Sequence, residues 1–537
     1  MFTRRELLMS VFGAAGAAVA GCARRSYPGS FRGASHEIGH RLRGATPERA
    51  AGPERRVRVA IVGGGASGLS AAWALERAGE RDFRVFELEP QAGGTSAFGT
   101  DGVVPHPWGA HYLPLPRAEQ RELVALLDEL GALVPRAGAD DAPRGREGAL
   151  VREPEERVFV DGEWHEGLFP SAIASPADLA ELARFEAEVA TWVRYRDARG
   201  RRAFTLPVRA CSDAAEVTAL DRQSAAQWLD ERGLRSAALR WWIEYACLDD
   251  YGLDLGATSA WAMLFYFASR RDTPGEHSAP FLTWPEGNGR LSAHLARVAG
   301  DRLRLGALVT EVAPEADSVS LAVADVAAGT AERWRAEYVI LATPKYVVPR
   351  ILRPWRDSPP AHLAAFRYGS WLVANLHLRE RPASRGFPFA WDNVLYDTPS
   401  LGYVVATHQR LADRGPTLWT YYLPVVDADA DAARRRLLAL EHGEAVAAIV
   451  AELAPAHLGL ERAIERVDLW RWGHAMVSPI PGFVWGAARR KAAEPLPRVS
   501  FASTDLSGVA LFEEAFDHGL RAASEALGQL RRQPGRG

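Results

Sequence analysis

Hydrophobic and polar positions along the chain follow two different periods, which predict alternating strands and helices. Residues 57–62, VRVAIV, form a short run rich in β-branched residues, and residues 83–87, FRVFE, form a second run. Between them, apolar residues recur at helical spacing from residue 68 to 79. Strand, helix and strand in this order are typical of a parallel βαβ unit.

The rest of the pattern predicts a second region of different character. Residues 169–196, 224–252 and 258–271 have a helical period, and residues 370–380 and 417–426 favour strands. The chain has 537 residues, 47% of them hydrophobic, and shows no fixed-period repeat. Because a single core stops growing well below this length, we expect two or more domains.

The first residues indicate a targeting segment. Arg4 and Arg5 precede a short, weakly apolar run, which favours a twin-arginine export signal over a membrane span. Residues 19–22, VAGC, resemble a bacterial lipoprotein processing site with Cys22 as the lipidated residue. We expect residues 1–22 to be this signal, the mature protein to be periplasmic or at the cell surface, and Cys22 to anchor it to the membrane. A chance arginine pair and cysteine is the alternative.

Residues 23–55 are rich in Arg, Gly, Ser and Pro and predict a linker, within which residues 37–44 are expected to pack on the surface. Net charge is -3 without a long basic block, which argues against nucleic acid as a partner. The only lysines, Lys345 and Lys491, are both expected to be solvated.

The cysteines show no metal-ligand spacing, so no metal site is expected. Cys211 and Cys247 can pair, but two buried free thiols are the favoured interpretation.

Three glycines follow the first predicted strand with the spacing G-x-G-x-x-G. Gly63 permits a tight turn, Gly65 lets a pyrophosphate approach the backbone amides, and Gly68 lets the helix lie close to the strand. Glu87 ends the second strand and is placed to accept hydrogen bonds from a ribose, where it would repel the phosphate of NADP. The turn therefore predicts a dinucleotide site that also includes Ala66 and Ser67.

A second glycine pair, Gly93 and Gly94, follows Glu87 in the sequence ELEPQAGGTSAFG. Here the chain resembles the flavin-containing amine oxidase and phytoene desaturase superfamily, which implies FAD as the cofactor. Members usually have Arg after the glycine pair, whereas this chain has Thr95.

Three later segments extend the resemblance in the expected order. Residues 307–312 resemble the strand whose valine, Val309 here, offers its backbone to the adenine. Residues 337–347 resemble the strand that ends in Ala-Thr-Pro, where Thr343 turns the chain out of the cofactor domain. Residues 499–527 resemble the last flavin motif, which implies that Asp505 contacts the cofactor and that the amides of Phe512 and Glu513 face the flavin. Glu514 stands where the family often has glycine.

Residues 105–116, PHPWGAHYLPLP, are the candidate for the reacting face. The resemblance implies that Gly109 and Ala110 lie along the flavin ring with Trp108 beside it. His111 is a candidate catalytic base near physiological pH, or else a hydrogen-bonded packing residue.

The resemblance implies an α/β fold: a discontinuous Rossmann-like FAD-binding domain with an inserted α+β substrate domain. The FAD-binding domain would comprise residues 56–115, 285–345 and 498–530. The substrate domain would comprise residues 116–284 and 346–497.

The implied reaction is hydride transfer from an amine or an apolar small molecule to flavin N5, with oxygen or a membrane quinone as the electron acceptor. The lysine that the amine-oxidising branch usually carries falls near Val373 here, so a polyene or isoprenoid desaturase is an alternative. A non-catalytic, electron-carrying flavin lipoprotein is another. A group of aromatic and acidic residues could form a cage for an amine or could simply be core: Trp241, Trp242, Glu244, Tyr245, Asp249, Asp250, Tyr251, Trp261 and Tyr266.

Overall fold

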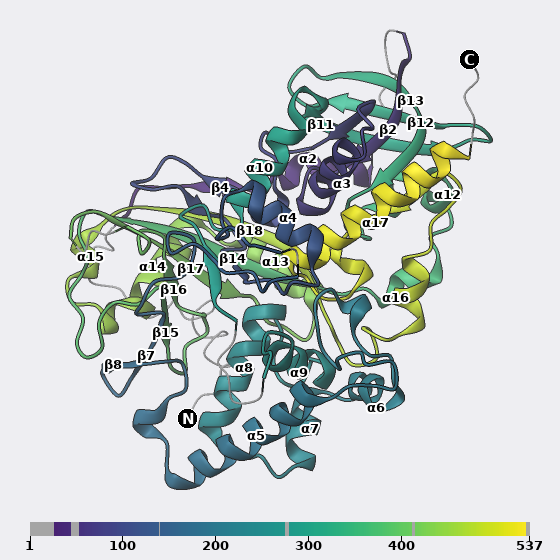
Figure 1. Ribbon diagram of the computed structural model, residues 1–537. Coiled ribbons are helices and arrows are strands. Elements are labelled where there is room, and N and C mark those ends of the chain that lie inside the picture. Colours follow the sequence, from purple (N-terminus) through teal and green to yellow (C-terminus); the bar gives the residue numbers. More distant parts are fainter. Residues whose placement is uncertain (1–25, 45–52, 139, 274–278, 411–413, 533–537) are drawn as a thin grey trace.

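The computed structural model describes residues 26–44, 53–138, 140–273, 279–410 and 414–532 (Figure 1). The predicted twin-arginine pair and Cys22 lie outside these residues. Figure 1 shows a sheet flanked by helices at the top, a second, larger sheet at the left and a group of helices at the bottom.

The first sheet has seven strands in the order β10-β3-β2-β13-β12-β11, with β19 also paired to β13. The pairs β10–β3, β3–β2, β2–β13 and β13–β19 are parallel, whereas the pairs β13–β12 and β12–β11 are antiparallel. All seven strands fall within the three segments predicted for the cofactor domain, except that β2 begins one residue earlier. Their bounds are β2 Arg55–Val62, β3 Phe83–Phe86, β10 Leu303–Arg304, β11 Ala307–Pro314, β12 Val319–Asp325, β13 Thr330–Leu341 and β19 Val499–Phe501.

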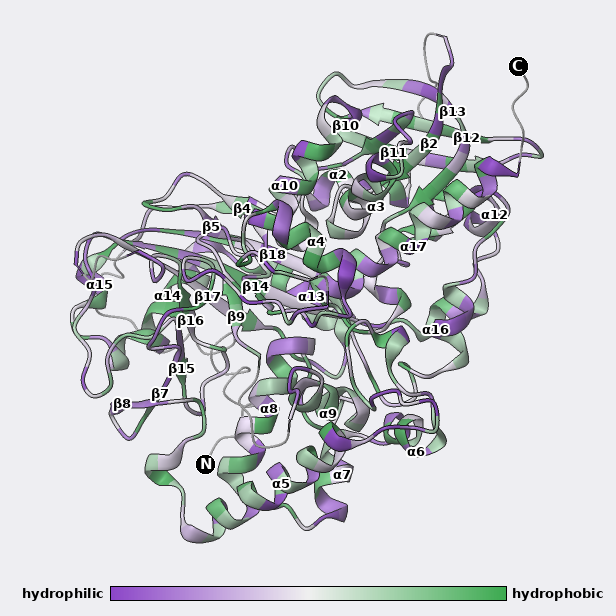
Figure 2. Ribbon diagram, viewed as in Figure 1, coloured by the Kyte–Doolittle hydropathy of each residue, from purple (hydrophilic) through white to green (hydrophobic). Residues whose placement is uncertain are grey.

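Helices α3 (Ala66–Arg77) and α17 (Phe512–Arg531) pack side by side on this sheet. Their small residues, among them Ala71 and Ala522, share one core with Val59 and Ile61 of β2. Figure 2 shows that α17 carries both apolar and polar residues along its length, as expected of an amphipathic helix that covers a sheet. The helix α10 (Gly289–Ala299) packs against α3.

The second sheet has eight strands in the order β1-β18-β14-β17-β16-β15-β7-β8. Alternate residues of its strands face opposite sides, so Leu372 and Leu376 pack with helices α13 and α14, whereas Val373 faces the other way. The bounds are β1 Phe31–Gly33, β7 Glu156–Val160, β8 Glu163–Glu166, β14 Tyr368–Leu378, β15 Asp392–Leu395, β16 Tyr403–Val405, β17 Thr417–Pro424, β18 Ile464–Val477, α13 Ala430–Ala439 and α14 His442–Leu453.

The helical group consists of α5 (Pro176–Arg194), α7 (Ala225–Glu231), α8 (Ala237–Tyr251) and α9 (Ala260–Ser269). The helical predictions are confirmed, but the stretch 224–252 forms two helices, because the chain turns at Gly233, whose φ is 63°. Cys211 and Cys247 are buried free thiols, as expected. In the part of the chain that the structure describes, no helix is long and apolar enough to cross a membrane.

The segment predicted as a linker is partly structured. Its strand β1 pairs in parallel with β18, which the sequence did not predict. The segment then crosses to the first sheet, where the amide and hydroxyl of Ser35 donate to the Glu89 carboxylate over 2.8 and 2.5 Å. Leu42 packs on the core of that sheet, which confirms that residues 37–44 lie on the surface of the fold.

Candidate active site

The glycine-rich turn has the geometry that its spacing predicts. Gly63 has φ of 106°, a conformation that L side chains rarely adopt. A Cβ on Gly68 would collide with the carbonyl oxygen of Gly63, so only glycine lets α3 lie this close. Gly65 is the N-cap of α3, and no side chain caps the helix. The first amides of α3 are therefore left for a ligand.

The second glycine pair meets this turn. Gly93 donates its N–H to the carbonyl oxygen of Gly64 over 2.9 Å, and Gly94 has φ of 58°. The Glu87 carboxylate accepts the Gly64 amide over 2.6 Å and the Glu89 amide over 2.8 Å. Burial raises the pKa of Glu87 to about 7. The acid predicted to bind the ribose therefore lies directly against the glycine turn.

The last flavin motif folds beside them. Helix α17 begins at Phe512 without a side-chain cap. Thr504, Phe512 and Glu513 line a cavity, called the central cavity below, whose other lining residues include Gly109, Ala110 and Tyr422. Asp505 is buried next to Thr504, where it accepts the Lys345 amide and the Tyr368 hydroxyl, each over 2.6 Å. Its predicted contact with the cofactor stays a prediction, as does that of Val309, which is buried on β11.

The expectation that Lys345 is solvated is wrong. Its Nζ lies 3.2 Å from the centre of the Phe501 ring, and the residue is buried because Trp355 also covers it. Lys491 forms an exposed ion pair with Glu494, as expected.

The residues of the glycine-rich turn and of the last flavin motif fit FAD. The Thr343 hydroxyl oxygen, in the turn next to Gly63, is buried without a hydrogen-bond partner among the described residues, and so is the side-chain oxygen of Asn288 at the cavity. Polar atoms of this kind call for a polar ligand. Two uncapped helix N-termini, those of α3 and α17, add unpaired amides on the same side of the sheet.

The loop at residues 107–111 is held tightly between the two sheets. The Trp108 carbonyl accepts from Trp472 Nε1 over 2.5 Å, and the Gly109 carbonyl accepts from the Tyr422 hydroxyl over 2.8 Å. Ala110 donates its N–H to the Thr95 carbonyl over 3.0 Å. A Cβ on Gly109 would collide with that same carbonyl oxygen, so glycine is required there.

His111 lines the cavity between aromatic rings, with ring centroids 4.9 Å from Tyr422 and 5.4 Å from Trp391. Burial lowers the pKa of His111 to about 3. The imidazole is therefore neutral at physiological pH and a weak base, which favours the packing interpretation over catalysis.

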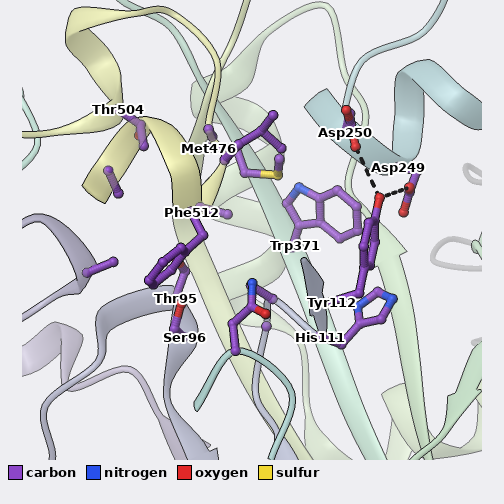
Figure 3. A pocket seen from close by; sticks show the side chains of 18 of the residues that line it. Thr95, Ser96, His111, Tyr112, Asp249, Asp250, Trp371, Met476, Thr504 and Phe512 are labelled. Carbon is purple, nitrogen blue, oxygen red and sulfur yellow. Dashed lines mark hydrogen bonds between the residues drawn. The ribbon is translucent and has the colours of Figure 1, made fainter. Parts of the chain in front are cut away.

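One wall of the cavity is acidic. The Arg270 guanidinium donates to both oxygens of Asp250, over 3.1 and 3.0 Å, so this buried cation is already paired. The Tyr112 hydroxyl lies 3.5 Å from both Asp249 and Asp250 (Figure 3). Burial and the carboxylates of Asp250 and Asp392 raise the pKa of Asp249 well above its ordinary value.

The aromatic lining comes from places that the sequence only partly indicated. Among the described residues that line the cavity there is none of the six aromatic residues of helices α8 and α9 proposed for a cage, and of their group only Asp249 and Asp250 reach it. Trp241 and Tyr245 instead pack in one cluster with Trp371 and Val373 of the lining. Strands β14, β17 and β18 supply the lining instead, through Trp371, Val373, Tyr422, Trp472 and Met476. A buried arginine such as Arg270 has no local signal that separates it from a solvated one.

A family model described as flavin-containing amine oxidoreductase matches residues 66–527. The chain belongs to this family. It is an FAD-dependent oxidoreductase with a Rossmann-like cofactor domain. No curated protein matches the chain.

Solved structures share the fold of this oxidoreductase at low sequence identity. A putrescine oxidase bound to putrescine has 21% identity and a TM-score of 0.65, over 89% of this chain and 100% of that one. The cyclohexylamine oxidase from Brevibacterium oxydans has 18% identity and a TM-score of 0.62, over the same shares of 89% and 100%. A fatty acid isomerase from P. acnes that produces CLA has 15% identity and a TM-score of 0.57, over 87% and 98%.

Proposed function

We propose that this oxidoreductase oxidises an amine. The observation that carries the proposal is the cavity lining, which includes three carboxyl groups, those of Asp249, Asp250 and Glu513, and among the described residues one cation, Arg270. Since Arg270 is paired with Asp250, the carboxyl groups of Asp249 and Glu513 remain without a paired cation. A bound ammonium would relieve the repulsion between Asp249 and its neighbours, whereas a neutral substrate would not.

The other residues of the cavity position the substrate. When bound, FAD accepts a hydride from the substrate carbon next to nitrogen. Trp371, Val373 and Tyr422 form an apolar surface that excludes water from that carbon, and the aromatic faces also attract a cation. The loop at Gly109 and Ala110 holds the opposite side through its hydrogen bonds to Tyr422 and Thr95.

The polyene or fatty-acid alternative is less well supported by the same wall. An anionic lipid would need a free cation, and the charge of Arg270 is already paired with the Asp250 carboxylate through two hydrogen bonds. A long hydrocarbon would also leave the acidic group of Asp249 without compensation in a buried cavity.

The test is anaerobic reduction of the bound flavin, followed near 450 nm, with mono- and diamines, amino acids, fatty acids and isoprenoids. We expect bleaching by amines alone. The Asp249→Asn variant should bind the amine about tenfold or more weakly, because charged hydrogen bonds contribute roughly 1.5–3 kcal/mol. Asp230→Asn, at an exposed ion pair with Arg240, is the matched control. Bleaching by lipids only, or by no compound, would reject the proposal, and the latter result would favour an electron carrier.

We further propose that the twin-arginine route exports the protein and that a lipid on Cys22 anchors it, with oxygen or a membrane quinone as the electron acceptor. The motifs at Arg4–Arg5 and Cys22 support this. Comparing the rates of reoxidation by oxygen and by a soluble quinone would distinguish the acceptors.

A further inference from the structure

Glu513 stands out among the groups around the cavity. It lies in the first turn of α17, only 5% of its surface is exposed, and it lines the cavity beside Phe512. Among the described residues, no other residue donates a hydrogen bond to its carboxyl group; its own backbone amide is the only donor. A buried carboxyl group that faces a cavity without a partner is suited to meet a ligand.

The other titratable groups at the cavity are engaged or unsuited to take up a proton. Asp250 is bound to Arg270, and His111 is a weak base because burial lowers its pKa to about 3. Glu514, the next residue of α17, accepts the Val208 amide over 2.7 Å. Asp249 lies beside Tyr112, across the Trp371 ring from Phe512 in Figure 3, on the side away from the last flavin motif.

The charges that act on Glu513 come from three helices. Arg270, at the end of α9, favours its ionised form, whereas Asp250 of α8 opposes it. Glu514 on its own helix is the remaining charged neighbour. Burial outweighs these effects and raises the pKa of Glu513 to about 7. A carboxyl group in this range exchanges a proton readily near neutral pH.

We propose that Glu513 is a catalytic residue, the base that accepts the proton from the substrate ammonium before the C–H bond breaks. This inference rests on the proposed amine oxidation. One N–H bond of the ammonium breaks and one O–H bond forms on the Glu513 carboxylate, which leaves a neutral amine and a neutral carboxylic acid. The lone pair freed on nitrogen then forms the C=N bond of an iminium ion as the adjacent carbon gives up its hydride, which bound FAD would accept. The Glu513 acid returns its proton to solvent.

The rate of flavin reduction by an amine should rise with pH if Glu513 is the base. Below about pH 7 the carboxyl group is protonated and cannot act as a base, so the limiting rate of anaerobic flavin reduction by a saturating amine should rise with pH through this value. In Glu513→Gln the limiting rate should fall about 100-fold, within the range typical of lost general-base catalysis, and the rise near pH 7 should disappear. Glu513→Asp should restore part of both.

Glu514→Gln is the matched control, since it removes the neighbouring buried carboxyl group of the same turn. It should keep the rise in rate with pH, at the same pH or slightly lower, because a carboxylate that opposes the ionisation of Glu513 is gone. A readout without substrate is the flavin absorption spectrum as a function of pH. A spectral step near pH 7 should occur in the wild type and in Glu514→Gln and be absent in Glu513→Gln, whose FAD content shows whether it has folded.

The outcomes separate the two proposals. If amines reduce the flavin and Glu513→Gln keeps the wild-type rate and profile, or if Asp249→Asn alone removes the rise, Glu513 is not the base. If no amine reduces the flavin while the spectral step is intact, the amine proposal fails, and the role of Glu513 fails with it for that reason.

Discussion

Two glycines of α17 provide a matched pair of substitutions that tests how the cofactor site is assembled. A Cβ on Gly519 would collide with the Ser67 carbonyl oxygen and lie 2.7 Å from Ser70 Cβ, well inside the 3.5–4.0 Å of normal carbon contacts. A Cβ on Gly528, nine residues further along the helix, meets nothing within 4 Å. Gly519→Ala should therefore push α17 away from α3, whereas Gly528→Ala should leave the two helices in place.

The magnitudes follow from helix propensity and packing. Alanine in place of glycine within a helix contributes about 1 kcal/mol of stability in both variants. Overpacking costs roughly 1–3 kcal/mol and affects Gly519→Ala alone, so the difference between the variants isolates the collision. Because α3 and α17 both present their N-termini at the site, moving them apart should weaken FAD binding. If FAD binding weakens by the full overpacking cost, the Kd for FAD rises about 5–150-fold.

The assay has two parts: urea unfolding of the holoprotein, and titration of the apoprotein with FAD followed by flavin fluorescence. Gly528→Ala should unfold at a urea concentration equal to or above that of the wild type and bind FAD equally well. Gly519→Ala should unfold at a lower urea concentration than Gly528→Ala and bind FAD more weakly than Gly528→Ala does. Equal FAD affinity and equal midpoints for the two variants would refute the close packing of α3 on α17 as a condition of the site.

Three further predictions concern the charge pair, the thiols and the anchor. Arg270→Met leaves the buried Asp250 carboxylate without its cation, which typically costs ~3–5 kcal/mol of folding stability, so the thermal midpoint should fall. Adding Asp250→Asn should recover most of the loss, and an unchanged midpoint in the single variant would contradict the pairing. Cys211 and Cys247 should not react with a thiol reagent until the protein is denatured, because both are buried and burial raises their pKa; rapid reaction of the native protein would show that they are accessible. Mass spectrometry after expression in a bacterium with a twin-arginine route should find a lipid on Cys22 and none in Cys22→Ser, and an unmodified cysteine would count against the anchor.

The local parts of the cofactor site could be predicted from the sequence. Gly63, Gly68 and Glu87 belong to one strand-helix-strand unit, where spacing along the chain determines position in space. The strands and helices with clear periods could also be predicted, because the spacing of apolar residues along the chain indicates which type of element buries them on one face.

The parts that depend on distant segments could not be predicted. Lys345 follows a turn and resembles a solvated lysine, but Trp355 and Phe501, from other elements, enclose it. The strand β1 has only three residues, Phe31–Gly33, too few to show a period. The cavity lining brings together residues as far apart in the chain as Ala66 and Ala515, and only the fold makes them neighbours.

The most direct test of amine recognition by the acidic wall is a crystal structure of the FAD-loaded protein with an unreactive amine bound. The account predicts that the amine nitrogen lies within hydrogen-bond distance, about 3 Å, of the carboxyl group of Glu513 or Asp249, with its carbon chain against Trp371 and Tyr422. An amine that binds with its nitrogen away from the carboxyl groups of both Glu513 and Asp249, or that does not enter the cavity, would contradict it.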